Sequence, residues 1–302
     1  MVNFFLIAFC IIAGMVLKAT RLIHPDAHKG INTWILYLAL PAVSFKYLPQ
    51  VHWSWQMLFP ALGILICVVG GWIWMWIYAH MKGYSARSRS TLQIVSAYPN
   101  TSFVGFPLVT AFFGEQYLSI AIVSDQMMFF LLSSLGIITA LQGGGQAGVI
   151  DAKIIARRLF TFPPFLGCIG ALVLSQFINL NFAEPFFDKL AATVAPLALF
   201  SVGLQLKFNG WRKLVPQISA AMVYKLLIAP AVVLLVAILL GVNGDIAKIS
   251  VFEVAMPTLL TASIIAEQFR LNTKLTNLTI GFGIIIGFVS VTFWYYVIEW
   301  LL

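Results

Sequence analysis

The chain has 302 residues, of which 61% are hydrophobic and only 9% are charged. A soluble domain carries about 25% charged residues, so this composition excludes an ordinary water-soluble fold and indicates a protein surrounded by lipid. The net charge of +8 would favour nucleic-acid binding in a soluble protein. Here the basic residues lie in short connections between apolar stretches, which indicates membrane orientation and no nucleic-acid partner.

A membrane-spanning helix needs about 20 mostly apolar residues. Ten stretches meet this requirement, and we number them as segments 1 to 10 in chain order: residues 2–20, 31–49, 56–80, 89–113, 116–141, 154–178, 186–206, 216–241, 246–268 and 275–301. The first stretch has no basic n-region and no small-residue cleavage site, so we expect a retained span rather than a signal peptide. The expected fold class is an all-α, multi-pass membrane protein, because the strand alternation of a β-barrel is absent.

Basic residues alternate along the connections between these segments. Most of the 18 lysines and arginines lie in or beside the connections after odd-numbered segments: Lys18, Arg21, Lys29, Lys82, Arg87, Arg89, Lys153, Arg157, Arg158, Lys207, Arg212, Lys213, Arg270 and Lys274. Cytoplasmic connections carry an excess of lysine and arginine. The pattern therefore predicts that the odd-numbered connections face the cytoplasm and that both termini lie outside the cell membrane.

Prolines recur at matching places in the two halves of the chain. Pro41 and Pro196 lie within segments 2 and 7, while Pro99 and Pro257 lie within segments 4 and 9, and both pairs have nearly the same spacing. We therefore expect two five-helix repeats, residues 1–145 and 146–302, joined around the glycine-rich stretch 142–148. Five is an odd number, so the second repeat would enter the membrane from the opposite side, an arrangement common in secondary transporters.

Polar residues follow the prolines of segments 4 and 9. Proline removes a backbone donor, and the freed groups need partners in lipid. Two helices broken at matching depth would present N-terminal N–H groups suited to a carboxylate; the alternative is a pair of ordinary proline kinks. The candidate substrate-binding residues are Pro99, Asn100, Thr101, Ser102, Pro257, Thr258 and Thr261. Pro107 has no counterpart in segment 9, and its role stays open.

Three ionisable residues lie inside the apolar segments, where such residues are candidates for function. Glu253 precedes Pro257 by one helical turn, and Asp125 lies in segment 5. Either acid could carry a coupling proton or help to bind Na⁺; the alternative is an interfacial or structurally paired acid. Lys225, in segment 8, could pair with one of them, or its side chain could reach back to the cytoplasmic interface. Lys46 and Glu299 lie near span ends and are expected to be interfacial.

The stretches SAYPNTSFVGFPLVTAFFG, residues 96–114, and VAMPTLLTASIIAEQF, residues 254–269, resemble the auxin efflux carrier family. That family includes bacterial carriers assigned to malate and malonate and the plant PIN auxin exporters. The resemblance implies the fold of the bile-acid sodium symporters. Segments 1, 2, 6 and 7 would form a scaffold, and segments 3–5 and 8–10 a transport domain that moves as an elevator.

The resemblance also bears on the site. In the plant relatives the substrate carboxylate meets a Pro-Asn pair in each broken helix. Pro99-Asn100 matches that pattern, whereas Pro257-Thr258 departs from it because a hydroxyl replaces the amide. Thr258 still offers one hydrogen-bond donor, but the paired donor and acceptor of an amide are lost. This departure puts an indole-acid substrate in doubt.

The expected function is secondary active transport of a small mono- or dicarboxylate, malate-like, malonate-like or auxin-like, coupled to H⁺ or Na⁺. The main alternative is a membrane-embedded carboxylate sensor without net transport. A channel lacks a pore-loop signature, and an enzyme lacks a catalytic constellation. We expect no cofactor beyond the coupling ion and no metal site, since Pro25 interrupts the spacing of His24 and His28. A homodimer is an open option for the aromatic, apolar surface.

Overall fold

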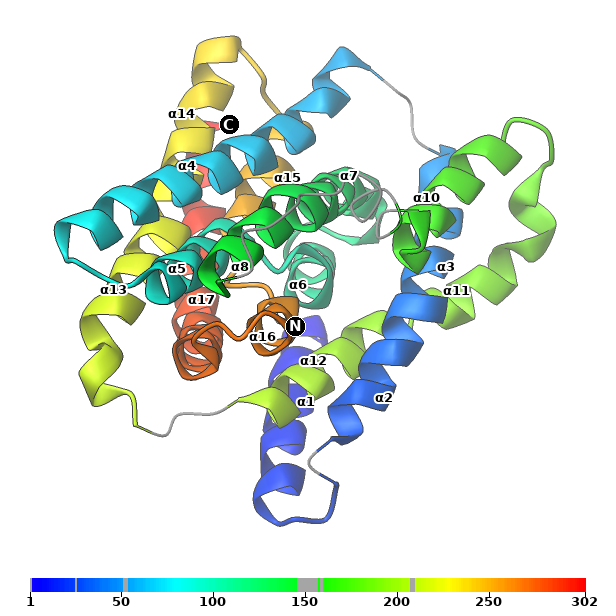
Figure 1. Cartoon of the computed structure of the whole chain (residues 1–302). Coiled ribbons are helices and arrows are strands. Elements are labelled where there is room, and N and C mark those ends of the chain that lie inside the picture. The colour runs from blue at the N-terminus through cyan, green and yellow to red at the C-terminus, as the bar shows by residue number, and fades with distance from the viewer. Residues whose placement is uncertain (1, 25, 51–53, 146–156, 158–159, 207–209) are drawn as a thin grey trace. The chain divides into compact units, whose positions relative to one another are not determined.

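The structure is a computed structural model, and it describes all residues except 1, 25, 51–53, 146–156, 158–159 and 207–209 (Figure 1). The described residues form helices and no strand, and one isolated β-bridge joins Pro99 to Thr258. The predicted joint between repeats lies partly outside the described residues, as do Lys153, Arg158 and Lys207. The all-α prediction is confirmed for the part of the chain that is described.

Five helices in the described residues are long and apolar enough to cross a membrane. They are Trp55–Met81, Glu115–Gly143, Glu184–Gln205, Arg212–Leu240 and Thr273–Leu301, which correspond to segments 3, 5, 7, 8 and 10. Shorter apolar helices cover Phe5–Ala19, Thr101–Phe112 and Pro163–Leu174. A multi-pass membrane protein is therefore supported, and the count of ten spans stays a prediction.

The chain divides into two compact units. Unit 1 comprises residues 1–54, 102–122 and 156–206. Its helices are α1 (Val2–Ala19), α2 (Ala27–Trp34), α3 (Leu40–Tyr47), α6 (Phe106–Phe112), α10 (Pro163–Leu174), α11 (Glu184–Ala191) and α12 (Val194–Gln205). Within this unit α1 packs along α12. Gly14 and Gly203 make that close approach, because a Cβ on either would collide with the backbone of the opposite helix.

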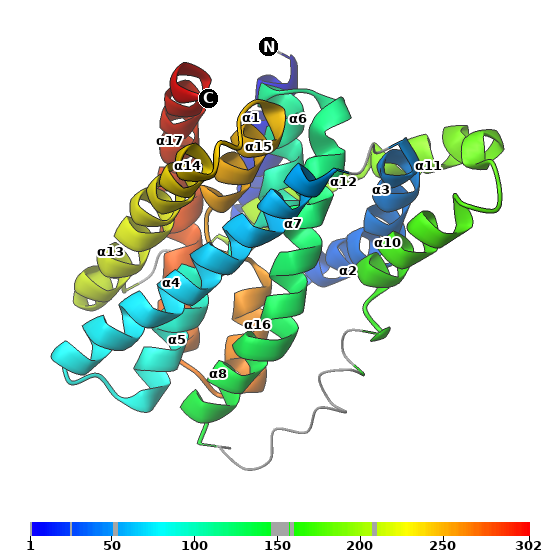
Figure 2. The same ribbon diagram turned by 90° about the horizontal axis from the view of Figure 1, so that it is seen from above.

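Unit 2 comprises residues 55–101, 123–155 and 207–302. Its helices are α4 (Phe59–Met81), α5 (Ala86–Ala97), α8 (Ile137–Gly143), α13 (Val215–Val223), α14 (Ala229–Leu240), α15 (Asp245–Val254), α16 (Thr261–Gln268) and α17 (Thr273–Leu301). The helix α7 (Leu118–Leu131) begins in unit 1 and continues into unit 2. Within unit 2, α4 packs against α5, α14 and α15 (Figure 2).

Three prolines share one local arrangement. A five-residue π-helical turn precedes each, and the proline is the second residue of the following α-helix: Pro41 after Ile35–Ala39, Pro107 after Thr101–Gly105 and Pro230 after Tyr224–Ile228. Proline lacks an N–H group, and its ring clashes with the carbonyl four residues back. The extra residue of a π-turn moves that carbonyl away. Pro107, whose role was open, thus marks the end of a π-turn.

Pro99 and Pro257 differ from these three, because the helix stops completely. The α5 helix ends at Ala97, and helical structure resumes only at Thr101. The α15 helix ends at Val254, and α16 begins at Thr261. Both interruptions lie at the prolines that the sequence singled out. Segment 7 has only a short turn between α11, which ends at Ala191, and α12, which begins at Val194, and Pro196 lies in the first turn of α12.

Candidate functional site

The two interrupted helices of unit 2 are joined through their backbones. The N–H of Asn100 donates to the carbonyl of Pro257 at 2.8 Å, and the N–H of Leu259 donates to the carbonyl of Tyr98 at 3.0 Å. These two hydrogen bonds form the antiparallel bridge between Pro99 and Thr258. Buried backbone groups need partners, and here each interruption supplies partners for the other. We call this feature the Pro99–Thr258 bridge.

Side chains reinforce the bridge from both sides. The Thr258 hydroxyl donates to the backbone carbonyl of Val95 at 2.6 Å. The Thr101 hydroxyl donates to the Asp125 carboxylate, on α7, at 2.6 Å. Asn100, Thr101, Thr258 and Asp125 are all buried. Five of the predicted residues, Pro99, Asn100, Thr101, Pro257 and Thr258, thus lie together in this unit.

Two other predicted residues follow the interruptions in sequence, one after each. Thr261 is the first residue of α16 and is half-buried. Ser102 is buried and belongs to unit 1, so it is described with that unit. A third helix contributes to the surroundings of Pro257, because a Cβ added to Gly287 of α17 would lie 3.1 Å from the Pro257 Cβ. The absence of a side chain at Gly287 therefore lets α17 pack closely on the bridge.

Glu253 lies at the end of α15 and has no exposed surface. Neither of its carboxylate oxygens has a hydrogen-bond partner among the described residues. A carboxylate that is buried without hydrogen-bond partners is energetically expensive. This carboxyl group is therefore suited to binding a proton or a cation, and it lies four residues before Pro257.

Lys225 is also buried, with 1% of its surface exposed. Its ammonium group donates to the carbonyl of Val254 at 2.9 Å and to the Cys67 sulfur at 3.2 Å. The alternative in which this side chain reaches back to the membrane interface is therefore wrong. Carbonyls at a helix C-terminus attract positive charge, and Lys225 supplies that charge beside Glu253.

Sequence reasoning missed two neighbours of this lysine. The Cys67 thiol, on α4, also donates to the carbonyl of Ala97 at 3.4 Å. Tyr224 donates through its hydroxyl to the carbonyl of Cys67 at 2.7 Å. No spacing signal links α4 to the π-turn that contains Lys225, so only the folded structure reveals these contacts. Among the described residues, no group of three or more His, Cys, Asp or Glu side chains could hold a metal ion.

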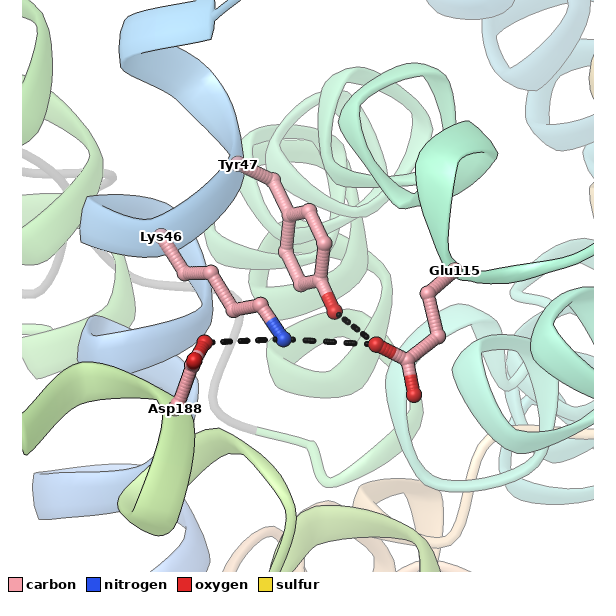
Figure 3. Close-up of polar contacts among 4 residues, drawn as sticks. All are labelled: Lys46, Tyr47, Glu115 and Asp188. Carbon is pink, nitrogen blue, oxygen red and sulfur yellow. Dashed lines mark hydrogen bonds and ion pairs between the residues drawn. The ribbon is translucent and has the colours of Figure 1, made fainter. Parts of the chain in front are cut away.

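Unit 1 contains a second polar group of a different kind, which we call the Lys46 cluster (Figure 3). The Lys46 ammonium lies 2.9 Å from the Asp188 carboxylate and 3.3 Å from that of Glu115. The Tyr47 hydroxyl donates to the same Glu115 oxygen at 2.9 Å. The cluster ties the end of α3 to α11 and to the turn before α7. The Glu115 and Asp188 side chains are 61% and 45% exposed, whereas the Lys46 side chain is 19% exposed, so the ion pairs join a largely covered lysine to two exposed acids.

Comparisons with known proteins bear on what such a chain does. The sequence model of the family described as "Membrane transport protein" matches residues 1–295. An "Uncharacterized transporter" of Methanothermobacter thermautotrophicus is 25% identical over 94% of this chain and 93% of its own. The "Putative malonate transporter" of Rhizobium meliloti is 26% identical over 94% of this chain and 91% of its own.

A plant protein extends the comparison. "Auxin efflux carrier component 5" of Arabidopsis thaliana is 20% identical over 91% of this chain and 90% of its own. The relatives are named as transporters or carriers, and the match to the family covers nearly all of the helical chain. The chain therefore belongs to the membrane transport protein family, to which the auxin efflux carriers also belong.

Proposed function

We propose that this membrane transporter is a secondary active carrier of a small organic anion, a mono- or dicarboxylate of the malonate, malate or auxin type. The observation that carries the proposal is the Pro99–Thr258 bridge, where two interrupted helices join in a buried, polar setting. Interrupted helices are tolerated in membranes where they pack in protein or line a cavity, and substrate sites of secondary transporters are built from them.

The carboxylate would bind beside this bridge. Helical structure begins at Thr101 after one interruption and at Thr261 after the other. The N–H groups at such ends favour an anion, and the Asn100 side chain adds an amide donor. Pro99, Pro257 and Thr258 complete the surroundings. Ser102 follows Thr101 in sequence, and its part in binding stays a sequence-based prediction. The names of relatives that refer to malonate and auxin favour a carboxylate cargo.

Coupling would depend on Glu253, assisted by Asp125 and Lys225. A buried carboxyl group without a hydrogen-bond partner among the described residues needs a proton or Na⁺ before it can be stable in a dry environment. Asp125 accepts a hydrogen bond from Thr101. Binding of a proton or Na⁺ by Asp125 would therefore change this hydrogen bond, next to the proposed anion site. Lys225 would balance part of the negative charge near an anionic substrate.

We further propose elevator movement of one unit past the other, with both termini outside the cell membrane. The helices α1–α3 and α10–α12 of the expected scaffold fall in unit 1, and segments 3, 8, 9 and 10 of the expected transport domain fall in unit 2. Segments 4 and 5 are divided between the units. The grouping supports two mechanical parts, each containing segments from both proposed inverted repeats. A homodimer is compatible with the proposal.

The test is uptake of radiolabelled malonate and malate into proteoliposomes that contain wild-type protein, Asn100→Ala or Asn243→Ala. Asn243 is an exposed residue after α14 and serves as the matched control. We expect saturable uptake with the same KM by wild type and Asn243→Ala, and a KM raised about tenfold or more in Asn100→Ala, the effect of losing a hydrogen bond to a charged group. Normal saturable uptake by Asn100→Ala would contradict the site. Stabilisation by malonate without any flux would instead favour the sensor.

A further inference from the structure

The Thr258 hydroxyl occupies a position that an ordinary helix would fill with a backbone N–H group. In an α-helix the carbonyl of each residue accepts a hydrogen bond from the N–H four residues later. For Val95 that residue is Pro99, which has no N–H group. The Thr258 hydroxyl donates to this carbonyl at 2.6 Å, and both residues are buried. Thr258 thus supplies from one interruption the donor that is missing from the other.

We propose that Thr258 is a positioning residue that completes the end of α5, and that the substrate carboxylate is recognised on the Asn100 side of the Pro99–Thr258 bridge. The second half of this inference rests on the proposed function. A hydroxyl has a single hydrogen to donate, and that hydrogen is directed to Val95. The remaining lone pairs of the oxygen only accept. A carboxylate also only accepts, so the Thr258 hydroxyl cannot bind one while it holds α5.

The second interruption does not need a hydrogen-bond donor from the first. The carbonyl four residues before Pro257 belongs to Glu253, and it accepts a hydrogen bond from the N–H of Met256 at 3.2 Å. The next carbonyl, that of Val254, accepts from the Lys225 ammonium at 2.9 Å. The end of α15 is therefore completed by its own chain and by a lysine. The carbonyl of Glu253 has its donor without the Asn100 side chain.

This asymmetry explains why the two interruptions can carry different residues after their prolines. Position 258 has to provide one donor at a fixed place, and a threonine does so with a short, β-branched side chain of restricted rotation. Position 100 would face the substrate, where an amide offers two N–H donors to a carboxylate. The departure from a Pro-Asn pair at Thr258 then changes the residue that completes the end of α5. Asn100, the residue proposed to bind the carboxylate, is still present.

The first arm of the test needs no substrate. Thermal unfolding is measured for wild type, Thr258→Val, Thr258→Ser, Pro99→Ala and the double variant Pro99→Ala with Thr258→Val. Valine keeps the volume of threonine without the hydroxyl, and serine keeps the hydroxyl. We expect Thr258→Val to lower the Tm and Thr258→Ser to stay near wild type. Alanine at position 99 restores an N–H group, so the loss caused by Thr258→Val should shrink in the Pro99→Ala background.

Equal losses of Tm in the two backgrounds, or equal losses for valine and serine at position 258, would overturn the positioning role. If Pro99→Ala does not fold, the comparison of Thr258→Val with Thr258→Ser still tests the positioning role. The second arm measures malonate uptake. Thr258→Val should lower the maximal rate per reconstituted protein with KM unchanged, whereas Asn100→Asp should raise KM about tenfold or more, the effect of losing a hydrogen bond to a charged group.

A rise in KM for Thr258→Val that equals that of Asn100→Asp, with an unchanged Tm, would make Thr258 a ligand and overturn the inference. Absence of malonate and malate uptake by wild type would overturn the proposed substrate class. The unfolding arm would still decide the role of Thr258 in that event, so the two failures are distinguishable.

Discussion

The Pro99–Thr258 bridge and the Lys46 cluster are both groups of polar contacts between distant parts of the chain, but their physical character is opposite. The bridge is buried, and most of its hydrogen bonds end on backbone carbonyls. The Lys46 cluster joins Lys46 and Tyr47 to two acids through side-chain contacts, and the two acids are 61% and 45% exposed while the lysine is 19% exposed. A buried polar group is costly when a partner is lost, whereas exposed ion pairs contribute about 0–1 kcal/mol. The bridge should therefore hold the two interrupted helices in a fixed arrangement. The cluster should hold α3, α11 and the turn before α7 together only weakly.

The largest effect is expected for a substitution of Glu253 in unit 2, which should abolish coupled transport without lowering thermal stability. Glu253→Gln keeps the shape of the side chain and removes its charge. Because the carboxyl group has no hydrogen-bond partner among the described residues, we expect the variant to unfold at the same or a higher temperature. Malonate accumulation driven by a pH or Na⁺ gradient should be abolished. The measurement is uptake with and without each gradient, and gradient-driven accumulation at the wild-type level would exclude Glu253 from coupling.

The next effect compares the two lysines directly. Lys225→Met removes an ammonium group that is buried and bonded to the carbonyl of Val254. Leaving such a carbonyl unpaired costs about 1–3 kcal/mol, so the free energy of unfolding should fall by roughly that amount. Lys46→Met is the matched control in unit 1, with an expected loss below about 1 kcal/mol. Equal losses for the two variants, measured by denaturant unfolding in detergent, would remove the contrast between the regions.

A smaller effect tests how closely α17 packs on the bridge. A Cβ at position 287 would lie 3.1 Å from the Pro257 Cβ, whereas a Cβ at position 283 would lie no closer than 3.8 Å to any neighbouring atom. Gly287→Ala should therefore cost roughly 1 kcal/mol through overpacking, and Gly283→Ala should be nearly neutral. Thermal unfolding checks both variants. A Gly283→Ala variant as unstable as Gly287→Ala would mean that the substituted helix, rather than the contact with Pro257, determines stability.

The smallest effect concerns salt. Exposed charges are screened when ionic strength rises, so the small loss caused by Glu115→Gln should disappear between about 0.01 M and 1 M salt. The loss caused by Thr258→Val should persist, because its hydrogen bond is buried and ends on a backbone carbonyl. Unfolding curves at the two salt concentrations provide the comparison. A salt-sensitive Thr258→Val variant would indicate that water reaches the bridge.

The sequence predicted a large part of this architecture for physical reasons. Apolar stretches of sufficient length indicated membrane helices, and prolines at positions 99 and 257 marked the two complete interruptions, because a missing N–H group is a property of the residue itself. Glu253 and Asp125 stood out as ionisable residues within apolar segments; the sequence left open whether they lie at an interface, and both are buried. These features are local, so the order of residues is sufficient to reveal them.

Long-range pairings could not be predicted in the same way. Nothing near Thr258 in the sequence indicates that its hydroxyl reaches Val95, and nothing near Lys225 points to Cys67 or to the carbonyl of Val254. The sequence also left open whether Lys225 extends to the interface. The π-turns before Pro41, Pro107 and Pro230 were missed as well, since they depend on how each helix accommodates its proline. Such features require the folded chain.

The most direct test of the central claim is binding of malonate to purified protein in lipid nanodiscs, measured by calorimetry for wild type, Asn100→Ala and Asn243→Ala. If the carboxylate is held on the Asn100 side of the Pro99–Thr258 bridge, wild type and Asn243→Ala should bind malonate with the same affinity. Asn100→Ala should bind it about tenfold or more weakly, as expected for a lost hydrogen bond to a charged group. Equal affinity in all three proteins would contradict the account.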